Sequence, residues 1–152
     1  MRAVGIDLGE RRIGVAVSDS GGVLAVPHST VSRSGDETED HAALARIVEE
    51  TGAERVVIGL PLSLDGSRGP AARKVLAEAT AIEAAVGVPV ELYDERFTTV
   101  SAARSLAGSG LSSRARRRVV DEAAATVLLQ SWLDGRSGHG APASSGPGSE
   151  RR

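Results

Sequence analysis

The stretch RAVGIDLGERRIGVAVS, residues 2–18, decides the fold of this chain. Two apolar runs, 2–9 and 12–18, are rich in Val and Ile and are separated only by the turn signal Gly9-Glu10, so both are predicted to be strands. A third apolar run over 23–32 follows the turn signal Ser20-Gly21-Gly22. Strands joined this tightly pair largely antiparallel, so the sequence predicts an antiparallel set of three.

Beyond residue 37 the pattern changes to helices that alternate with strands. The segments predicted there are helices over 38–51 (ended by Gly52), 70–86 (begun by Pro70 and ended near Gly87), 98–107 and 115–134 (ended at Gly135), strands over 54–60 and 88–94, and a Gly/Ser linker over 108–113. A strand that is preceded by a helix joins its sheet in parallel. The predicted fold class is therefore α/β, with a mixed five-stranded sheet in the order βββαβαβα and helices on its faces.

The composition limits the classes of protein to which the chain can belong. Its 152 residues suit one domain, and only 2% are aromatic, so the core must consist of Ala, Val, Leu and Ile. The absence of Cys excludes disulfides, thiolate metal sites and a Cys nucleophile. We find no signal-peptide profile and no membrane-length apolar run, so a soluble, cytoplasmic protein is expected. The composition also predicts a domain over 1–135 and a disordered tail over 136–152, which is mainly Gly, Ser, Pro and Ala.

Carboxylates stand at three places where a folded chain normally avoids charge. Asp7 interrupts the first apolar run and shares a strand face with Gly5, which leaves space in front of it. Asp94 and Glu95 end the last predicted strand, and the residues alone do not decide between them. Asp121 lies on an apolar face of the final helix. If the fold brings the three places together, they predict a divalent-metal site for phosphodiester chemistry.

Each of these acids also has an ordinary structural interpretation. Asp7 is suited to starting the turn at Leu8-Gly9, and the Asp94-Glu95 pair to capping the helix that follows. Asp121 is one helical turn from Arg117 and Arg118, so a local ion pair would also account for it.

The net charge of −2 argues against a general polyanion binder, so a nucleic-acid partner would have to be held locally, at a basic patch. The densest basic run, 114–118, occupies the start of the final helix, where the helix dipole disfavours positive charge. The loop over 61–69 contains an Asp65-Gly66 turn whose N–H groups suit phosphate, although ordinary turn chemistry explains it nearly as well. The predicted nucleic-acid-binding set is Arg11, Arg12, Asp65, Gly66, Ser67, Arg96, Thr98, Arg114, Arg116, Arg117 and Arg118.

Four blocks of the sequence, taken together, resemble one family. The blocks are GIDLGERRIGVAVSD at 5–19, GLPLSLDGS at 59–67, YDERFTTV at 93–100 and VDEAAATVLLQSWL at 120–133. They resemble the YqgF/RuvX family, described as pre-16S rRNA nucleases and as Holliday-junction-resolvase-like proteins, over nearly all of 1–135. The resemblance implies an RNase H-like fold. It also implies that Asp7, Glu95 and Asp121 are the family's catalytic and metal-binding acids, which chooses Glu95 over Asp94.

The resemblance also implies an activity, a cofactor and partners. The activity would be Mg²⁺- or Mn²⁺-dependent cleavage of RNA, at the 5′ end of pre-16S rRNA, by a monomer or homodimer that meets the ribosomal small-subunit precursor and no membrane. RuvC-type resolvases carry a further acid on the last helix where this chain has Ala124, so branched DNA is the alternative substrate. A non-catalytic RNA-binding assembly factor is another alternative. A nucleotide-binding protein of the actin and chaperone type is disfavoured, because one domain cannot provide its two lobes.

Overall fold

A mixed sheet of five strands forms the centre of the molecule. The computed structural model describes residues 1–98 and 114–140, with the side chains of 1–98 and 120–136. The order of the strands in the sheet is β3-β2-β1-β4-β5, with β1 antiparallel to β2, β2 antiparallel to β3, and both β1–β4 and β4–β5 parallel. The predicted fold class is confirmed. The strands are β1 (Ala3–Leu8), β2 (Arg12–Ser18), β3 (Ala25–Ser32), β4 (Arg55–Leu60) and β5 (Val90–Asp94).

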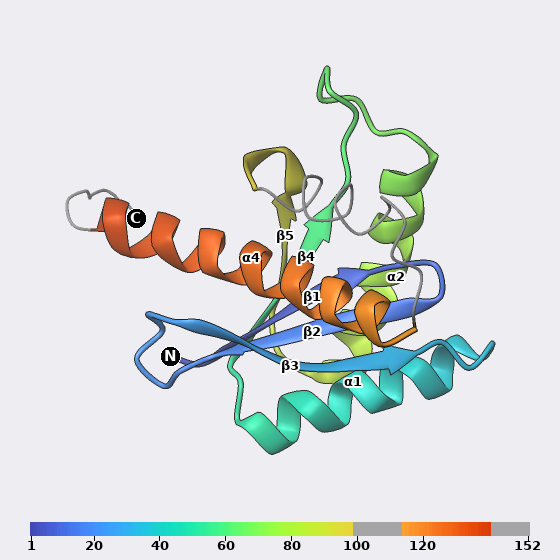
Figure 1. Ribbon diagram of the computed structural model, residues 1–152, viewed down its shortest axis with the longest axis horizontal. Coiled ribbons are helices and arrows are strands. Elements are labelled where there is room, and N and C mark those ends of the chain that lie inside the picture. Colours follow the sequence, from blue (N-terminus) through green and yellow to red (C-terminus); the bar gives the residue numbers. More distant parts are fainter. Residues whose placement is uncertain (99–113, 141–152) are drawn as a thin grey trace.

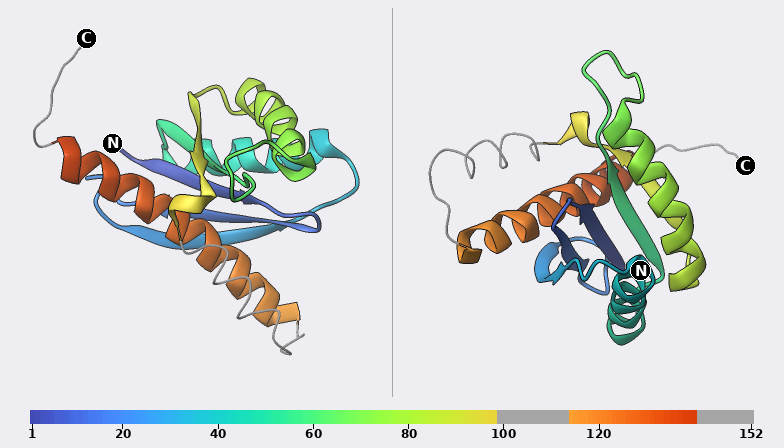
Figure 2. Two further views of the ribbon diagram at one scale, coloured as in Figure 1. Left: turned by 90° about the horizontal axis from the view of Figure 1, so that it is seen from above. Right: turned by 90° about the vertical axis from the view of Figure 1, so that its right-hand side faces the viewer.

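Helices cover both faces of this sheet. Helices α1 (Glu37–Thr51) and α2 (Pro70–Val86) lie against one face, while α4 (Arg114–Gly140) crosses β1, β2 and β3 on the other (Figures 1 and 2). Gly52 and Gly87 end α1 and α2 with φ angles of 71° and 73°, as their positions in the sequence predicted. A short 3-10 helix, η1 (Glu95–Phe97), follows β5 directly.

The two faces of β1 bury different kinds of side chain. Val4 and Ile6 belong to the core shared with α1 and α2, which is built from branched aliphatic residues. On the opposite face, Ala3 packs with Leu129 and Trp132 of α4. Because side chains alternate along a strand, Gly5 and Asp7 share one face, as predicted, and this is the face that α4 covers.

Glycines let the backbone of α4 approach the sheet closely. A Cβ atom on Gly5 would lie 2.7 Å from the Cβ of Leu129. A Cβ on Gly14 would collide with the carbonyl oxygen of Asp121. Any larger residue at these two positions would push the helix away from the sheet.

The final helix extends further than the sequence predicted. We expected it to end at Gly135, but it continues to Gly140, so the predicted stop is wrong. A glycine inside a helix costs only about 1 kcal/mol relative to alanine, which a packed helix can tolerate. The predicted disordered tail is therefore helical over 136–140, and the rest of it lies outside the described residues. The predicted linker over 108–113 also lies outside them, as does the helix predicted over 98–107 except for its first residue.

A buried polar cluster ties the turn between β1 and β2 to the helices behind the sheet. Arg33 donates to both carboxylate oxygens of Glu78, at 2.6 and 3.0 Å, and to the carbonyl oxygen of Gly9 at 3.0 Å. His41 Nε2 lies 2.8 Å from the same carboxylate. Burial alone raises the pKa of Glu78, but the hydrogen bonds from Arg33 and His41 outweigh it and hold that pKa below its ordinary value.

The contact between Gly14 and α4 yields a stability prediction. We expect Gly14→Ala to lower the free energy of unfolding by about 2–3 kcal/mol, because the new methyl group must displace helix backbone. Urea denaturation measures this. Gly135→Ala is the matched control, since its Cβ would meet nothing within 4 Å and alanine favours a helix. Equal losses in the two variants would contradict the close approach.

The lowered pKa of Glu78 yields a prediction of pH dependence. Because the folded-state pKa lies below the unfolded one, this carboxylate stabilises the fold above about pH 5, and the contribution is lost as the pH falls towards the folded-state pKa. We expect Glu78→Gln to lower the free energy of unfolding by about 3 kcal/mol at pH 7 and by clearly less at pH 3.5, in urea denaturation. The exposed Glu50→Gln variant should match the wild type at both pH values. A loss from Glu78→Gln that does not change with pH would refute this role.

Candidate active site

Asp7 lies between two glycines on the neighbouring strands. Asp7 pairs directly with Gly14 of β2. Ile6 pairs with Ile58 of β4, so the next residue of β4, Gly59, is level with Asp7 on the same face. Neighbouring strands are about 4.8 Å apart, so each glycine, which has no side chain, leaves room for another residue immediately beside the Asp7 side chain. The Asp7 side chain itself is buried, with 2% of its residue surface exposed.

Asp121 occupies the space over Gly14. Its carbonyl oxygen touches the position that a Cβ on Gly14 would take, which fixes this turn of α4 over β2. The neighbouring residue Glu122 accepts a 2.9 Å hydrogen bond from Thr30, which is the partner of Gly14 on β3. The helix residue that carries the third acid is therefore held beside Asp7.

Glu95 occupies the space over Gly59. A Cβ on Gly59 would lie 2.8 Å from Glu95 Oε2, and Glu95 is 7% exposed. The alternative acid, Asp94, instead accepts hydrogen bonds from the backbone and side chain of Arg96. The carboxylate that reaches across the sheet beside Asp7 is thus that of Glu95, the acid that the family resemblance selects.

These contacts align five positions across the sheet, which we call the Asp7 row: Tyr93, Gly59, Asp7, Gly14 and Thr30. Thr30 bonds to α4 near one end, and the hydroxyl of Tyr93 lies 3.1 Å from Ser131 Oγ near the other. Helix α4 is therefore fixed at both ends of the row, with the acids at its centre. The glycines were not predicted as site residues, although a glycine inside an apolar strand is a signal of close approach.

Asp121 forms an ion pair that the sequence did not predict. Arg12 Nε donates to Asp121 Oδ2 at 2.7 Å, and both side chains are 21% exposed. The sequence suggested a local partner in Arg117 or Arg118, whose side chains lie outside the described residues. Arg12 begins β2 and comes from 109 residues away in the chain. The pair compensates the charge of a carboxylate at the edge of the core.

The three acids come to the same part of the sheet, but their side chains are not gathered around a common point. Among residues 1–98 and the described part of α4, no group of three acidic, His or Cys side chains is arranged to hold a metal. Glu95 lies over Gly59, which is level with Asp7, while the Asp121 carboxylate is engaged by Arg12. The position of a fourth acid is filled by Ala124, which is 1% exposed and packs with Leu128.

The loop between β4 and α2 uses its own polar groups. Gly66 donates its N–H to the carbonyl oxygen of Ser63 at 2.8 Å, and Ser67 donates to Asp65 Oδ1 at 2.9 Å. These are the two N–H groups that were predicted from the sequence as ligands for phosphate. Both are engaged within the loop, because Asp65 and the left-handed Gly66 close a tight turn.

The other predicted nucleic-acid-binding residues lie in different surroundings. Arg11 is exposed on the turn after β1, and its carbonyl oxygen accepts from Arg33 N at 2.9 Å. The hydroxyl of Thr98 donates to the carbonyl oxygen of Glu95 at 2.9 Å and closes the turn that holds this acid. The remaining four predicted arginines are placed by their backbone alone, on the first turns of α4: Arg114, Arg116, Arg117 and Arg118.

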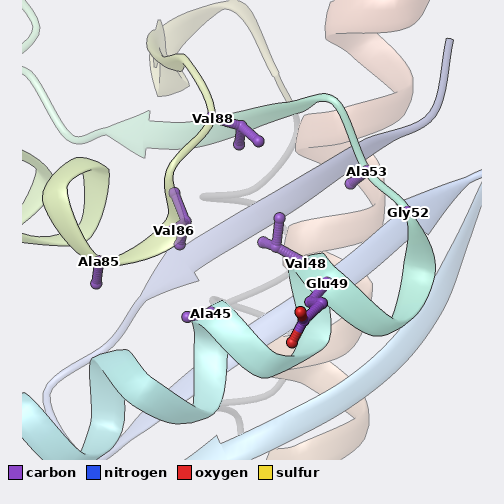
Figure 3. A pocket seen from close by; sticks show the side chains of 8 residues that line it. All are labelled: Ala45, Val48, Glu49, Gly52, Ala53, Ala85, Val86 and Val88. Carbon is purple, nitrogen blue, oxygen red and sulfur yellow. The ribbon is translucent and has the colours of Figure 1, made fainter.

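A cavity between α1 and α2 and the side chain of Trp132 are not part of the site. A cavity of about 410 Å³ lies between the ends of α1 and α2, lined by Ala45, Val48, Val86 and Glu49 among others (Figure 3). It is on the face of the sheet opposite Asp7 and offers a single ionisable group. Trp132 is 3% exposed and donates to Glu91 at 3.0 Å, so it is a packing residue.

Comparisons with known proteins identify the family of this chain. Residues 1–135 match the family model RuvX, described as Holliday junction resolvase. A Rhodococcus opacus (strain B4) protein is 49% identical over 90% of this chain and 79% of its own length, and one from Anaeromyxobacter dehalogenans (strain 2CP-C) is 47% identical over 90% and 99%. Both are named as pre-16S rRNA nucleases.

Solved structures share the fold at lower identity. Thermus thermophilus RuvC, at 19% identity, superposes with a TM-score of 0.53 over 91% of this chain and 97% of its own. The same protein in complex with its Holliday junction substrate gives 0.56 over 91% and 96%. Nucleases with this RNase H-like fold normally use divalent metal ions. No helix in the described part of the chain is long and apolar enough to cross a membrane. This chain belongs to the RuvX family of nucleases with an RNase H-like fold.

Proposed function

We propose that this protein is a divalent-metal-dependent nuclease that processes the 5′ end of pre-16S rRNA. The observation that carries the proposal is the Asp7 row, in which Asp7 lies between Glu95 over Gly59 and Asp121 over Gly14. Burying carboxylates together is costly unless positive charge compensates them. The names of the relatives from Rhodococcus and Anaeromyxobacter support the RNA substrate.

The donor atoms of the three acids suit Mg²⁺ or Mn²⁺, and an ion would have to draw together side chains that are not arranged around one point in the described residues. Asp7, Glu95 and Asp121 offer only carboxylate oxygens, which hard divalent cations prefer. These three side chains are the proposed ligands and catalytic residues. When bound, such an ion supplies positive charge that stabilises the charge developing on phosphoryl oxygens and favours deprotonation of an attacking water.

The chain's own residues prepare this site in two ways. The burial of Asp7 inside β1 fixes the direction of its carboxylate. Arg12 orients the Asp121 carboxylate through Nε, and within the described part of the chain only this nitrogen of the guanidinium is engaged. The two Nη groups of Arg12 are thus donors for a substrate phosphate beside the acids.

Arg11 and the arginines at the start of α4 would hold the nucleic-acid backbone without reading its sequence. Arg11 is exposed at the turn next to the acids, and the arginines over 114–118 begin the helix that carries Asp121. The loop of Asp65, Gly66 and Ser67 lies at the carboxyl end of β4, beyond Gly59. A strand of RNA that reaches the acids would pass between these groups.

Branched DNA is the second candidate substrate, because the matching family model is described as Holliday junction resolvase. The buried Ala124 favours RNA as the first choice, since it leaves one acid fewer than the resolvases that this chain resembles. The two substrates can be compared directly in the experiment that tests the nuclease itself.

The decisive variant is Asp7→Asn, assayed with Mn²⁺ on a 5′ precursor fragment of 16S rRNA and on a four-way DNA junction. We expect cleavage of the RNA by the wild type and a kcat at least about a hundredfold lower in the variant, because a metal ligand is lost. The melting temperature and the affinity for RNA should stay close to those of the wild type.

Glu10→Gln is the matched control, since Glu10 is an exposed acid three residues from Asp7. It should cleave at the wild-type rate. Cleavage of the DNA junction alone would favour the resolvase alternative. Full activity of pure Asp7→Asn protein, or binding of RNA without any cleavage by the wild type, would contradict the proposed function.

A further inference from the structure

Arg96 follows the candidate acid Glu95, and its guanidinium is occupied by the protein itself. Its Nε lies 3.1 and 3.0 Å from the two carboxylate oxygens of Asp94, and its Nη2 lies 2.7 Å from Oδ2. Its Nη1 donates to the carbonyl oxygen of Leu64 at 3.2 Å. Every nitrogen of the side chain therefore has a partner within the fold.

These contacts join two segments that are far apart in the sequence. Asp94 caps η1, the short helix that begins with Glu95, by accepting from Arg96 N at 2.9 Å. Leu64 belongs to the loop between β4 and α2. This loop follows β4 and η1 follows β5, so the two lie next to each other at the carboxyl ends of neighbouring strands (Figure 2). The same guanidinium nitrogen that reaches Leu64 lies 3.3 Å from where a Cβ on Gly66 would be.

The loop presents a closed turn to this guanidinium. Ser63 and Ser67 are joined by a 3.0 Å backbone hydrogen bond, and Gly66 has a φ of 86°, so the chain between them is tightly folded. The pKa of Arg96 is raised mainly by its hydrogen bonds to Asp94, and the charge of Asp65 in the loop contributes in the same direction. Leu64, in contrast, is 95% exposed, so its side chain does not anchor the tip of the loop to the described part of the chain. Within the described residues, Arg96 is the side chain from outside the loop that fastens this tip.

We infer that Arg96 is a positioning residue, which fastens the loop over 63–67 to the turn that carries Glu95 and acts through its ion pair with Asp94. A substrate phosphate could take the guanidinium fork only in exchange for the Asp94 carboxylate. The inference rests on the proposed function for its consequence in catalysis, but the structural coupling itself is independent of any nuclease activity.

The test compares Arg96→Gln with Asp94→Asn. The two changes remove opposite partners of one ion pair, and asparagine still caps a helix, so the second variant isolates the pair. If Arg96 positions the loop, both variants change amide exchange, RNA binding and kcat in the same way. If Arg96 binds phosphate, RNA binding differs between them, because Asp94→Asn releases an arginine for the substrate. Arg46→Gln is the control for loss of one positive charge, since Arg46 is exposed on α1.

Two measurements need no cleavage. Hydrogen exchange of the Gly66 and Ser67 amides should become about tenfold or more faster in both variants and should not change in Arg46→Gln. RNA affinity is also measured at several salt concentrations. The slope of its logarithm against the logarithm of salt concentration should stay at the wild-type value in all three variants, because no phosphate contact is lost.

A third measurement links the loop to catalysis. Both variants should lower kcat by a similar factor, about tenfold, with KM within about twofold of the wild type. The inference is overturned if Arg96→Gln alone lowers the salt slope, by about one, or if Asp94→Asn binds RNA more tightly than the wild type. Unchanged amide exchange in both variants would also overturn it. If the wild-type protein cleaves no RNA, the proposed function fails, while amide exchange and salt dependence still decide the role of Arg96.

Discussion

The close contact between the backbone of α4 and the glycines of β1 and β2 is the constraint on which the site depends. With Gly5 and Gly14 in the strands, a turn of the helix lies directly on the sheet, and Asp121 comes to lie beside Asp7. A larger side chain at either position would separate the two acids by the thickness of that side chain. Since protein interiors are close-packed, such a shift would also disturb the packing of Leu129 and the rest of α4.

On the other side of Asp7, a glycine again leaves space for a neighbouring residue. Gly59 leaves the space that the Glu95 carboxylate fills, and the turn over 95–98 holds that acid through two bonds from Thr98 to the Glu95 carbonyl oxygen. The fold therefore places one acid on a central strand, the Glu95 carboxylate over the glycine of one neighbouring strand, and the backbone of Asp121 over the glycine of the other. Electrostatics would oppose this gathering, and the Arg12 guanidinium compensates part of it at Asp121.

Much of this arrangement follows from local patterns in the sequence. The alternation of side chains put Gly5 and Asp7 on one face, and the helix stops at Gly52 and Gly87 follow from the preference of glycine for a left-handed conformation. The family resemblance chose Glu95 over Asp94, and in the structure Asp94 is bound by Arg96.

Other features depend on partners that no local pattern reveals. The ion pair of Asp121 involves Arg12, 109 residues away, whereas the sequence suggested an arginine one helical turn away. The N–H groups of Gly66 and Ser67 were suited to phosphate by type, but the loop closes on itself and uses them. The positions of Gly14 and Gly59 beside Asp7 could not be predicted from the sequence, because they depend on the register of three strands, which is set by the tertiary structure.

The most direct test of the central claim is a titration with substoichiometric Mn²⁺, followed by paramagnetic broadening of the backbone amide signals. If the three acids form one metal site, the amides of Asp7, Gly14, Gly59 and Glu95 broaden first and most strongly, because Mn²⁺ would lie over the centre of the Asp7 row. Strongest broadening at another acidic segment, such as the start of α1, would contradict the account, as would the absence of any broadening near Asp7.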